Sequence, residues 1–185
     1  MSQGTERRRA VFLDRDGVIN RRGRFGVVRE WEEFEFLPGV LESLTRLAAT
    51  DYAIVVCTNQ PWVGLGYIRR RSLDEIHVRM VRAIEDAGGR IDIVEAAVLA
   101  PWFTDRRRKP RPGMLEDAAE RLLLGPQGSW MVGDNRKDMV AGKRFGCGTI
   151  LVDPRPRTTA QGAEELADYV AADLPEAIAY ILKHQ

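Results

Sequence analysis

The sequence predicts an α/β fold: a doubly wound, Rossmann-like, mainly parallel sheet with helices on both faces and no cap domain. Short apolar stretches alternate along the chain with amphipathic stretches at helical spacing, as they do in strand-helix-strand units. These short stretches are apolar throughout rather than at every second residue, which is typical of strands buried on both faces. We expect a single domain over residues 1–185, with a flexible lead-in over residues 1–9.

The first half of the chain contains two predicted strands and the helix between them. Residues 10–13 form an apolar run that stops at Asp14, with Gly17 following, which predicts a buried strand with polar residues at its tip. Pro38-Gly39 opens a helical pattern over residues 40–48, and residues 52–57 (YAIVVC) form the second strand. The three elements make one crossover unit.

The second half repeats this alternation. Residues 72–87 carry apolar side chains on one helical face and end at Gly88-Gly89, after which residues 91–99 supply a third strand. Residues 112–124 are predicted to be helical. A strand over 130–132, a helix over 136–145, a strand over 149–152 and an amphipathic helix over 174–182 complete the chain.

Composition narrows the classes of partner. The chain of 185 residues has 28 basic and 27 acidic residues, so no overall charge favours nucleic acid or a membrane surface. Only Cys57 and Cys147 are present, too few for a disulfide framework, and no apolar run approaches the roughly 18 residues of a membrane span. We expect a cytoplasmic protein, a monomer or small homo-oligomer, with no nucleic-acid or membrane partner.

Two aspartates follow the first predicted strand directly. Asp14 and Asp16 are two residues apart, so an extended backbone would point both side chains the same way. A carboxylate beside a divalent cation can attack phosphorus, and a second carboxylate can protonate the leaving oxygen and later deprotonate water. An acidic turn, or the metal-binding DxD of a glycosyltransferase, explains this pair alone as well.

A hydroxyl and a lysine form the second and third candidate groups. Thr58 ends the second predicted strand, where its hydroxyl and the following backbone N–H groups can hold phosphate oxygens. Lys109 lies in the basic run 106–111 and can neutralise a transferring phosphoryl group. Taken singly, a turn and a solvated basic loop are the simpler explanations.

Two further aspartates follow the fourth predicted strand. Asp134 comes after Gly133 and lies four residues before Asp138, so both share one face of a helix's first turn. Magnesium prefers oxygen ligands and keeps waters, so Asp134, Asp14 and the carbonyl of Asp16 would suffice to bind it. Helix capping by Asp134 is the alternative explanation.

Together the four groups resemble the four motifs of the haloacid dehalogenase superfamily: DxDGV at Asp14, Thr58, Lys109 with its following proline, and GDxxxD at Asp134. The resemblance covers residues 10–152. It implies that Asp14 is the nucleophile and a metal ligand, and that Asp16 is the general acid/base. It further implies that Thr58 and Lys109 stabilise the phosphate, and that Asp134 binds Mg²⁺ with Gly133 and Asp138 in support. An acidic residue two after the nucleophile marks the phosphatases of this superfamily.

The intervals between these motifs hold only loop, helix and strand, so the resemblance points to the capless subgroup. Within it, FLDRDGVIN, FEFLPGV, VCTNQ, RKPRPGML and MVGDNRKDM are most similar to D-glycero-D-manno-heptose 1,7-bisphosphate phosphatases and to histidinol-phosphate phosphatases. This implies a small phosphorylated metabolite as substrate, first a sugar bisphosphate of carbohydrate metabolism. The side chains expected to contact it are Asn20, Asn59, Gln60 and Arg108.

The chain also departs from those families. Where many of their members hold zinc with Cys and His, residues 99–110 read LAPWFTDRRRKP, so we expect no zinc. Leu65 stands where those families carry an arginine. Trp62 and Trp102 fall in loops beside the expected site and either stack on substrate or pack elsewhere. His77 has no evident catalytic partner in the sequence.

Three functions remain open. The first is a sugar-phosphate phosphatase, for which histidinol phosphate or another phosphomonoester is the alternative substrate. The second is a phosphatase of polynucleotide ends, and the third is an inactive phosphate-binding module. Asp14 and Asp16 argue against the last. A nucleic-acid enzyme should show a wide basic face with aromatic platforms, and the neutral charge balance outside residues 106–111 makes this a minor alternative.

Overall fold

A single parallel sheet forms the centre of the molecule, in a computed structural model that describes residues 7–153 and 162–184. Its six strands run in the order β3-β2-β1-β4-β5-β6, and every neighbouring pair is parallel. The strands are β1 (Ala10–Leu13), β2 (Ala53–Asn59), β3 (Ile93–Ala97), β4 (Trp130–Gly133), β5 (Gly148–Val152) and β6 (Tyr169–Ala171). The predicted doubly wound parallel sheet is confirmed, and the strand order reverses between β1 and β4.

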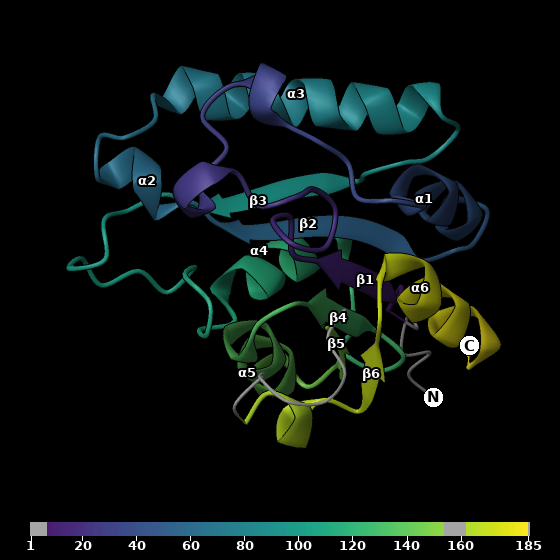
Figure 1. The fold of residues 1–185 in the computed structure, drawn as a ribbon. Coiled ribbons are helices and arrows are strands. Elements are labelled where there is room, and N and C mark those ends of the chain that lie inside the picture. Colours follow the sequence, from purple (N-terminus) through teal and green to yellow (C-terminus); the bar gives the residue numbers. More distant parts are fainter. Residues whose placement is uncertain (1–6, 154–161, 185) are drawn as a thin grey trace.

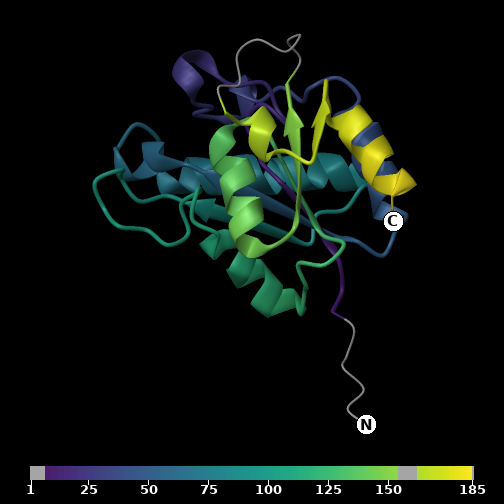
Figure 2. The ribbon, with the colours of Figure 1, turned by 90° about the horizontal axis from the view of Figure 1, so that it is seen from below.

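Helices cover both faces of this sheet (Figure 1). One face carries α1 (Val40–Ala48), α3 (Arg70–Asp86) and α6 (Leu174–Lys183), and the other carries α4 (Gly113–Leu122) and α5 (Arg136–Phe145). Figure 2, seen from the opposite side to α3, shows α4 and α5 in front of the sheet. The short helix α2 (Pro61–Gly64) and the 3₁₀ turns η1 (Arg24–Gly26), η2 (Trp31–Glu33) and η3 (Glu164–Leu166) lie in connections.

The alternation of side chains along β1 explains why both faces are covered. Val11 and Leu13 pack in the cluster that contains α1, α3 and α6, whereas Ala10 and Phe12 pack in the cluster of α4 and α5. All four side chains are fully buried. A strand with two buried faces must be apolar at every position, which is the pattern that predicted it.

Element boundaries differ modestly from the sequence-based expectations. The third strand is limited to Ile93–Ala97, and the short elements α2 and β6 were not predicted. β6 has three residues, too few to show a periodic pattern. Of the expected lead-in over residues 1–9, residues 1–6 lie outside the described residues, while Arg8 and Arg9 are bonded to Asp51.

The connections after β1, β2 and β3 gather on the side to which the strand arrowheads point (Figure 1). Between Asp14 and α1 the chain forms only 3₁₀ turns, and between Thr58 and Lys109 it forms α2, α3 and β3. No folded domain is inserted in either interval, as predicted. The carboxyl ends of the central strands therefore open toward loops, not toward a cap.

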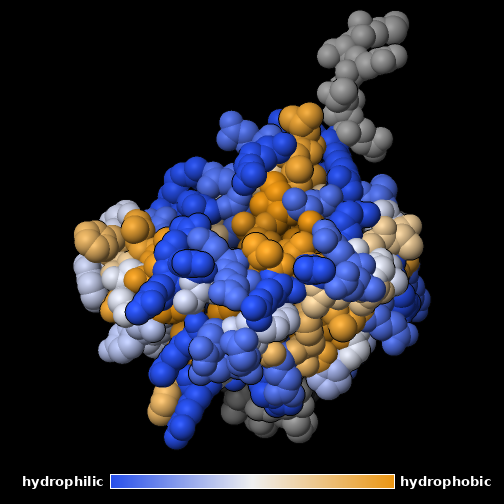
Figure 3. Space-filling model, turned by 90° about the horizontal axis from the view of Figure 1, so that it is seen from above, coloured by the Kyte–Doolittle hydropathy of each residue, from blue (hydrophilic) through white to orange (hydrophobic). Residues whose placement is uncertain are grey.

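The α3 side of the surface is mainly hydrophilic, with its most extensive apolar area near the centre of the view, among charged side chains (Figure 3). On this side a groove of about 580 Å³ runs between α3 and the edge strand β3, and Val78, Val81 and Val94 are among its lining residues. No helix in the described ranges has the length and hydropathy of a membrane span.

Candidate active site

Three neighbouring strands bring the predicted groups to one edge of the sheet. Asp14 follows β1 and its N–H donates to Val132 of β4 (2.9 Å), Thr58 lies near the end of β2, and Asp134 follows β4. The order β2-β1-β4 spans the point where strand order reverses, which is where open α/β sheets bind their ligands. Parallel strands thus place residues distant in the sequence beside one another.

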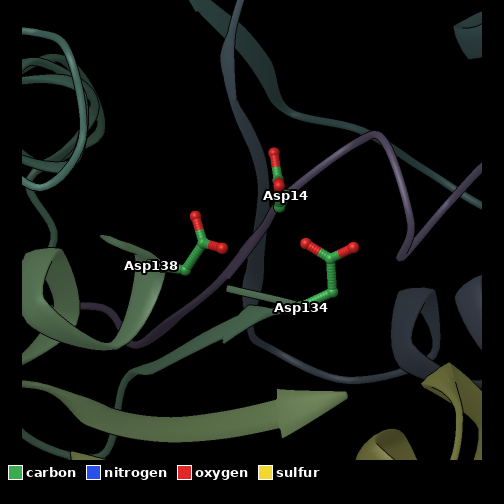
Figure 4. A group of neighbouring side chains, drawn as sticks. All are labelled: Asp14, Asp134 and Asp138. Carbon is green, nitrogen blue, oxygen red and sulfur yellow. The ribbon is translucent and has the colours of Figure 1, made fainter. Parts of the chain in front are cut away.

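Three carboxylates converge at this edge (Figure 4). One oxygen from each of Asp14, Asp134 and Asp138 lies within 4.8 Å of the others. Gly17 makes room for the group: a Cβ there would lie 1.8 Å from Asp134 Oδ2, and its φ of +95° suits glycine. A donor set made only of carboxylate oxygens fits a hard cation such as Mg²⁺.

Lys109 lies beneath these carboxylates with a fully buried side chain. Its Nζ is 3.0 Å from Asp14 Oδ1 and 2.6 Å from Asp138 Oδ1, and it donates to the Cys57 carbonyl (2.6 Å). Burial alone would lower the pKa of Lys109, but the charges of Asp138 and Asp14 raise it above its ordinary value. The ammonium therefore stays charged beside the Asp14 carboxylate.

Asn59 fixes the backbone of Lys109. Its Nδ2 donates to the Lys109 carbonyl (2.9 Å), and its Oδ1 accepts from the Lys109 N–H (3.0 Å). The sequence predicts that this amide contacts substrate. In the structure its oxygen and one of its N–H groups bond to the Lys109 backbone, and these two bonds join β2 to the loop before α4. Asn59 is thereby a positioning residue for Lys109.

Asp16 is held by three side chains. Arg15 Nη2 donates to both carboxylate oxygens (2.9 and 3.0 Å), Asn20 Nδ2 donates to Oδ1 (3.0 Å), and Gln60 Nε2 donates to Oδ2 (2.7 Å). Burial would raise the pKa of Asp16, but the Arg15 charge and these hydrogen bonds outweigh it and lower the pKa. The carboxylate is ionised and fixed in orientation.

Asn20 and Gln60, like Asn59, were expected to bind substrate. Both are buried, with exposed fractions of 0% and 1%, and their amide groups are used within the protein. Gln60 also donates to the Thr58 hydroxyl oxygen (2.9 Å), which leaves the Thr58 O–H free to donate to a phosphate oxygen. The amides of Asn20 and Gln60 therefore hydrogen-bond to Asp16 and Thr58, whereas Asn59 also lines the pocket described next.

A pocket of about 290 Å³ opens above Asp14 and Asp16. Its other lining residues are Arg22, Gly26, Asn59, Pro61, Trp62 and Lys137. A larger cavity of about 740 Å³ shares Arg22 but contains neither Asp14 nor Asp16. The smaller pocket is the catalytic candidate because a phosphate in it can reach both carboxylates.

Comparison with known proteins agrees with this geometry. The HAD-hydrolase-like family model matches residues 106–177. A D-glycero-beta-D-manno-heptose-1,7-bisphosphate 7-phosphatase of Pasteurella multocida is 35% identical over 92% of this chain and 97% of the relative. The chain belongs to the haloacid dehalogenase-like phosphatases. The resemblance predicted from four motifs is confirmed.

Solved structures place this HAD-like phosphatase in the same group. The heptose 1,7-bisphosphate phosphatase of Bordetella bronchiseptica, complexed with magnesium and phosphate, has a TM-score of 0.84 and 30% identity, covering 96% of this chain and 99% of that one. A putative HAD-like phosphatase of Mesorhizobium loti has a TM-score of 0.79 and 28% identity, covering 96% and 87%.

Arg108 and Trp102 of this HAD-like phosphatase lie outside the pocket above Asp14. Arg108 Nη2 donates to the Leu99 carbonyl, and Arg108 and Trp102 line another hollow of about 500 Å³, of which Lys109 is also a lining residue. Trp102 is 71% exposed, whereas Trp62 lines the pocket above Asp14. Of these two tryptophans, only Trp62 is among the residues that line the pocket with Asp14 and Asp16.

Four residues at or behind the site were not predicted. Arg22 donates to both oxygens of Asp134 (2.6 to 3.1 Å), and Lys137 lines the pocket. Arg15 is fully buried, and its Nη1 is 3.1 Å from His77 Nε2. His77, whose sequence surroundings suggested neither catalysis nor metal binding, contacts Arg15 because the packing of α3 brings the two side chains together. Nothing in the local pattern of residues 72–87 signals that contact.

Proposed function

We propose that this protein hydrolyses a phosphorylated sugar with Mg²⁺ as cofactor, and that its substrate is D-glycero-beta-D-manno-heptose 1,7-bisphosphate, cleaved at the 7-phosphate. The observation that carries the chemistry is that Asp14 lies 3.0 Å from the Lys109 ammonium and has an oxygen within 4.8 Å of oxygens of Asp134 and Asp138. The substrate is suggested by the names of relatives that cover nearly the whole chain.

In the first step, one carboxylate oxygen of Asp14 attacks phosphorus. The new O–P bond forms as the bond from phosphorus to the sugar oxygen breaks, and that oxygen takes a proton from the Asp16 carboxyl. Asp16 is ionised in the free protein, since its pKa is lowered. A bound phosphate anion raises the pKa of Asp16, which favours the protonated form that this step requires.

In the second step, water attacks the phosphorus of the aspartyl phosphate. Asp16 accepts the proton of that water, the bond between phosphorus and Asp14 breaks, and inorganic phosphate leaves. The hydrogen bonds from Arg15, Asn20 and Gln60 suit this step, because they hold Asp16 ionised and aimed. Lys109 and the Thr58 hydroxyl offset negative charge on the phosphoryl oxygens in both steps.

Asp14, Asp134 and Asp138 are the side chains available to hold Mg²⁺, together with the Asp16 carbonyl. When bound, the ion supplies positive charge to a phosphoryl oxygen and lets two anions approach. We further propose a cytoplasmic location, which is supported by the two free, buried cysteines, Cys57 and Cys147.

A panel of phosphate esters tests the substrate. Phosphate release is measured with Mg²⁺ for the heptose 1,7-bisphosphate, sugar monophosphates, histidinol phosphate, nucleotides and 5′-phosphorylated oligonucleotides, and again with EDTA. We expect the highest kcat/KM for the heptose bisphosphate and loss of activity with EDTA. A higher kcat/KM for histidinol phosphate or an oligonucleotide would reject this substrate.

A further inference from the structure

The outer face of α3 carries an exposed valine among charged side chains. α3 lies outermost on its side of the sheet (Figure 1), and its buried residues, which face the interior, are Leu73, Ile76, Met80 and Ile84. Val78 lies on the opposite side of the helix and is 67% exposed. A single exposed valine is ordinary on a protein surface, but this one belongs to a larger apolar feature.

That feature is the groove of about 580 Å³ between α3 and β3. Val78, Val81 and Val94 are its apolar lining residues. β3 is the edge strand of the sheet and pairs with β2, so its other edge faces away from the sheet. A groove beside such an edge can receive an apolar side chain from a second molecule.

The charged residues of this face are arranged symmetrically about Val78 and with opposite sign. Arg71 lies seven positions before Val78, and Glu85 lies seven positions after it. Asp74 lies four positions before it, and Arg82 lies four positions after it. Residues four and seven positions apart share one face of a helix, and all four charged residues are exposed. Turning the helix end for end about Val78 therefore places each charge where one of opposite sign stood.

We propose that the α3 face centred on Val78 binds a second copy of this chain, with the two α3 helices antiparallel across a two-fold axis at Val78. Arg71 of each protomer then faces Glu85 of the other, and Asp74 faces Arg82. The two Val78 side chains meet at the axis, beside the groove that Val81 lines. This dimer goes beyond the proposed function and does not depend on it.

Ion pairing within one protomer leaves the outer charges available. Arg71 and Glu85 form no ion pair with any residue in the described part of the chain, whereas Asp74 pairs with Arg70 along the helix. Exposed pairs of that kind contribute little and can rearrange at an interface. A parallel arrangement of the two helices would set Arg71 against Arg71 and Glu85 against Glu85. Repulsion between like charges thus selects the antiparallel arrangement.

The length of the contact indicates a weak dimer. Arg71 and Glu85 are separated by about 21 Å along the helix axis, from a rise of about 1.5 Å per residue. One pair of helices of this length buries less than the roughly 1,200–2,000 Å² of a stable interface. We expect a reversible dimer with a Kd on the order of 10–100 µM.

Sedimentation velocity at protein concentrations from well below to well above that Kd tests the dimer. The mass should rise from that of one chain, 20.9 kDa, toward twice that value. High salt should weaken the dimer, because it screens exposed ion pairs.

Val78→Asp tests the position of the axis. It places two like charges against each other, so the Kd of the dimer should rise more than about 10-fold. Leu123→Asp is the matched control, because Leu123 is 74% exposed and follows α4 on the other face of the sheet. The control should leave Kd unchanged. Circular dichroism checks that both variants are folded.

A charge exchange tests the register of the two helices. Arg71→Glu and Glu85→Arg should each raise Kd about 10-fold, because each turns two attractive pairs into repulsive ones. The double variant Arg71→Glu/Glu85→Arg restores opposite charges and should return Kd to near the wild-type value. Such recovery requires that these two positions face each other across the interface.

Three results would overturn the proposal. The first is the mass of a single chain at every concentration. The second is a dimer that Val78→Asp leaves intact, or that Leu123→Asp weakens as much, since its contact would lie outside α3. The third is a double charge variant that dimerises no better than the single variants. Phosphate release by the same proteins is measured separately, so failure of the dimer and failure of the proposed function are distinguishable.

Discussion

Asp16 illustrates how single residues set the chemistry at this edge of the sheet. Its carboxylate accepts hydrogen bonds from Arg15, Asn20 and Gln60, and Arg15 is itself bound to His77. An arginine can only donate, so His77 accepts at Nε2 and carries its proton at Nδ1. A chain of contacts thus runs from α3 through a fully buried guanidinium to the proposed acid/base.

Asp16→Asn tests the acid/base role. The amide cannot exchange a proton, so kcat should fall about 100- to 10,000-fold with a sugar phosphate. With p-nitrophenyl phosphate, whose leaving group needs no proton, formation of the aspartyl phosphate should be affected much less. Single-turnover kinetics with both esters measure this difference. If the rate of aspartyl-phosphate formation fell equally with the sugar phosphate and with p-nitrophenyl phosphate, Asp16 would act only in positioning.

His77 makes stability depend on pH. Burial and the charge of Arg15 lower its pKa to about 3, while in the unfolded chain it titrates near 6.5. Between these values the unfolded state binds more protons, so the free energy of unfolding falls as pH falls, by up to about 1.4 kcal/mol per pH unit. In His77→Gln this contribution should disappear.

Urea denaturation of wild type and His77→Gln between pH 4.5 and 7.5 measures that difference. The difference in the free energy of unfolding between wild type and His77→Gln should become smaller as the pH falls below 6.5. Parallel curves would mean that His77 is not held neutral. Because Arg15 positions Asp16, the pH profile of kcat should shift in the same variant, which simple loss of packing would not cause.

At the scale of elements, the connection from β3 to α4 carries Lys109 and is held by ion pairs. Glu95 of β3 is 4% exposed and pairs with Arg107 of the loop and with Arg121 of α4. Asp117 of α4 adds pairs to Arg106 and Arg107. These contacts join strand, loop and helix immediately before the lysine that contacts Asp14.

Glu95→Gln should loosen this connection. Removing the buried charge takes one of its two carboxylate partners from Arg107 and the partner of Arg121, so the free energy of unfolding should fall by about 1 to 3 kcal/mol. The value of kcat should fall as well, since the loop immediately before Lys109 loses its ion pair to β3. Chemical denaturation and phosphate release measure both, with exposed Glu85→Gln as control. Unchanged stability and turnover would show that the network does not position Lys109.

At the scale of the whole molecule, apolar strands and helical spacing sufficed to predict the parallel sheet and its layers. Burial on both faces leaves a strong sequence pattern, as in residues 10–13 and 52–57. Motif spacing also predicted that Asp14, Lys109, Asp134 and Asp138 meet. Parallel strands end at a common edge, so residues at strand ends meet whatever lies between them.

The sequence did not predict the direction in which individual side chains point at the site, because that direction depends on tertiary contacts. Asn20, Asn59 and Gln60 follow strand ends like the catalytic groups, yet their amides bond inward to Asp16 and Lys109. Arg22 lies in a loop without periodicity, and its contact with Asp134 spans 112 positions. Such contacts leave no local pattern.

Metal binding should stabilise the whole fold. A ligand that binds only the native state adds about 2.7 kcal/mol to the free energy of unfolding when its free concentration is one hundred times its Kd. For a chain of this size, that raises Tm by several degrees. Thermal scans with and without Mg²⁺ should show this rise in wild type and in the surface control Asp86→Asn, and little rise in Asp134→Asn. Equal shifts in all three would place the ion elsewhere.

The measurement that tests the central claim most directly is phosphate release by wild type and by Asp14→Asn with Mg²⁺. Asparagine keeps the shape of Asp14 but cannot form the aspartyl phosphate, so turnover should fall on the order of 10³-fold or more while the variant stays folded and still binds substrate. Turnover near the wild-type rate in a folded Asp14→Asn would contradict the assignment of Asp14 as nucleophile.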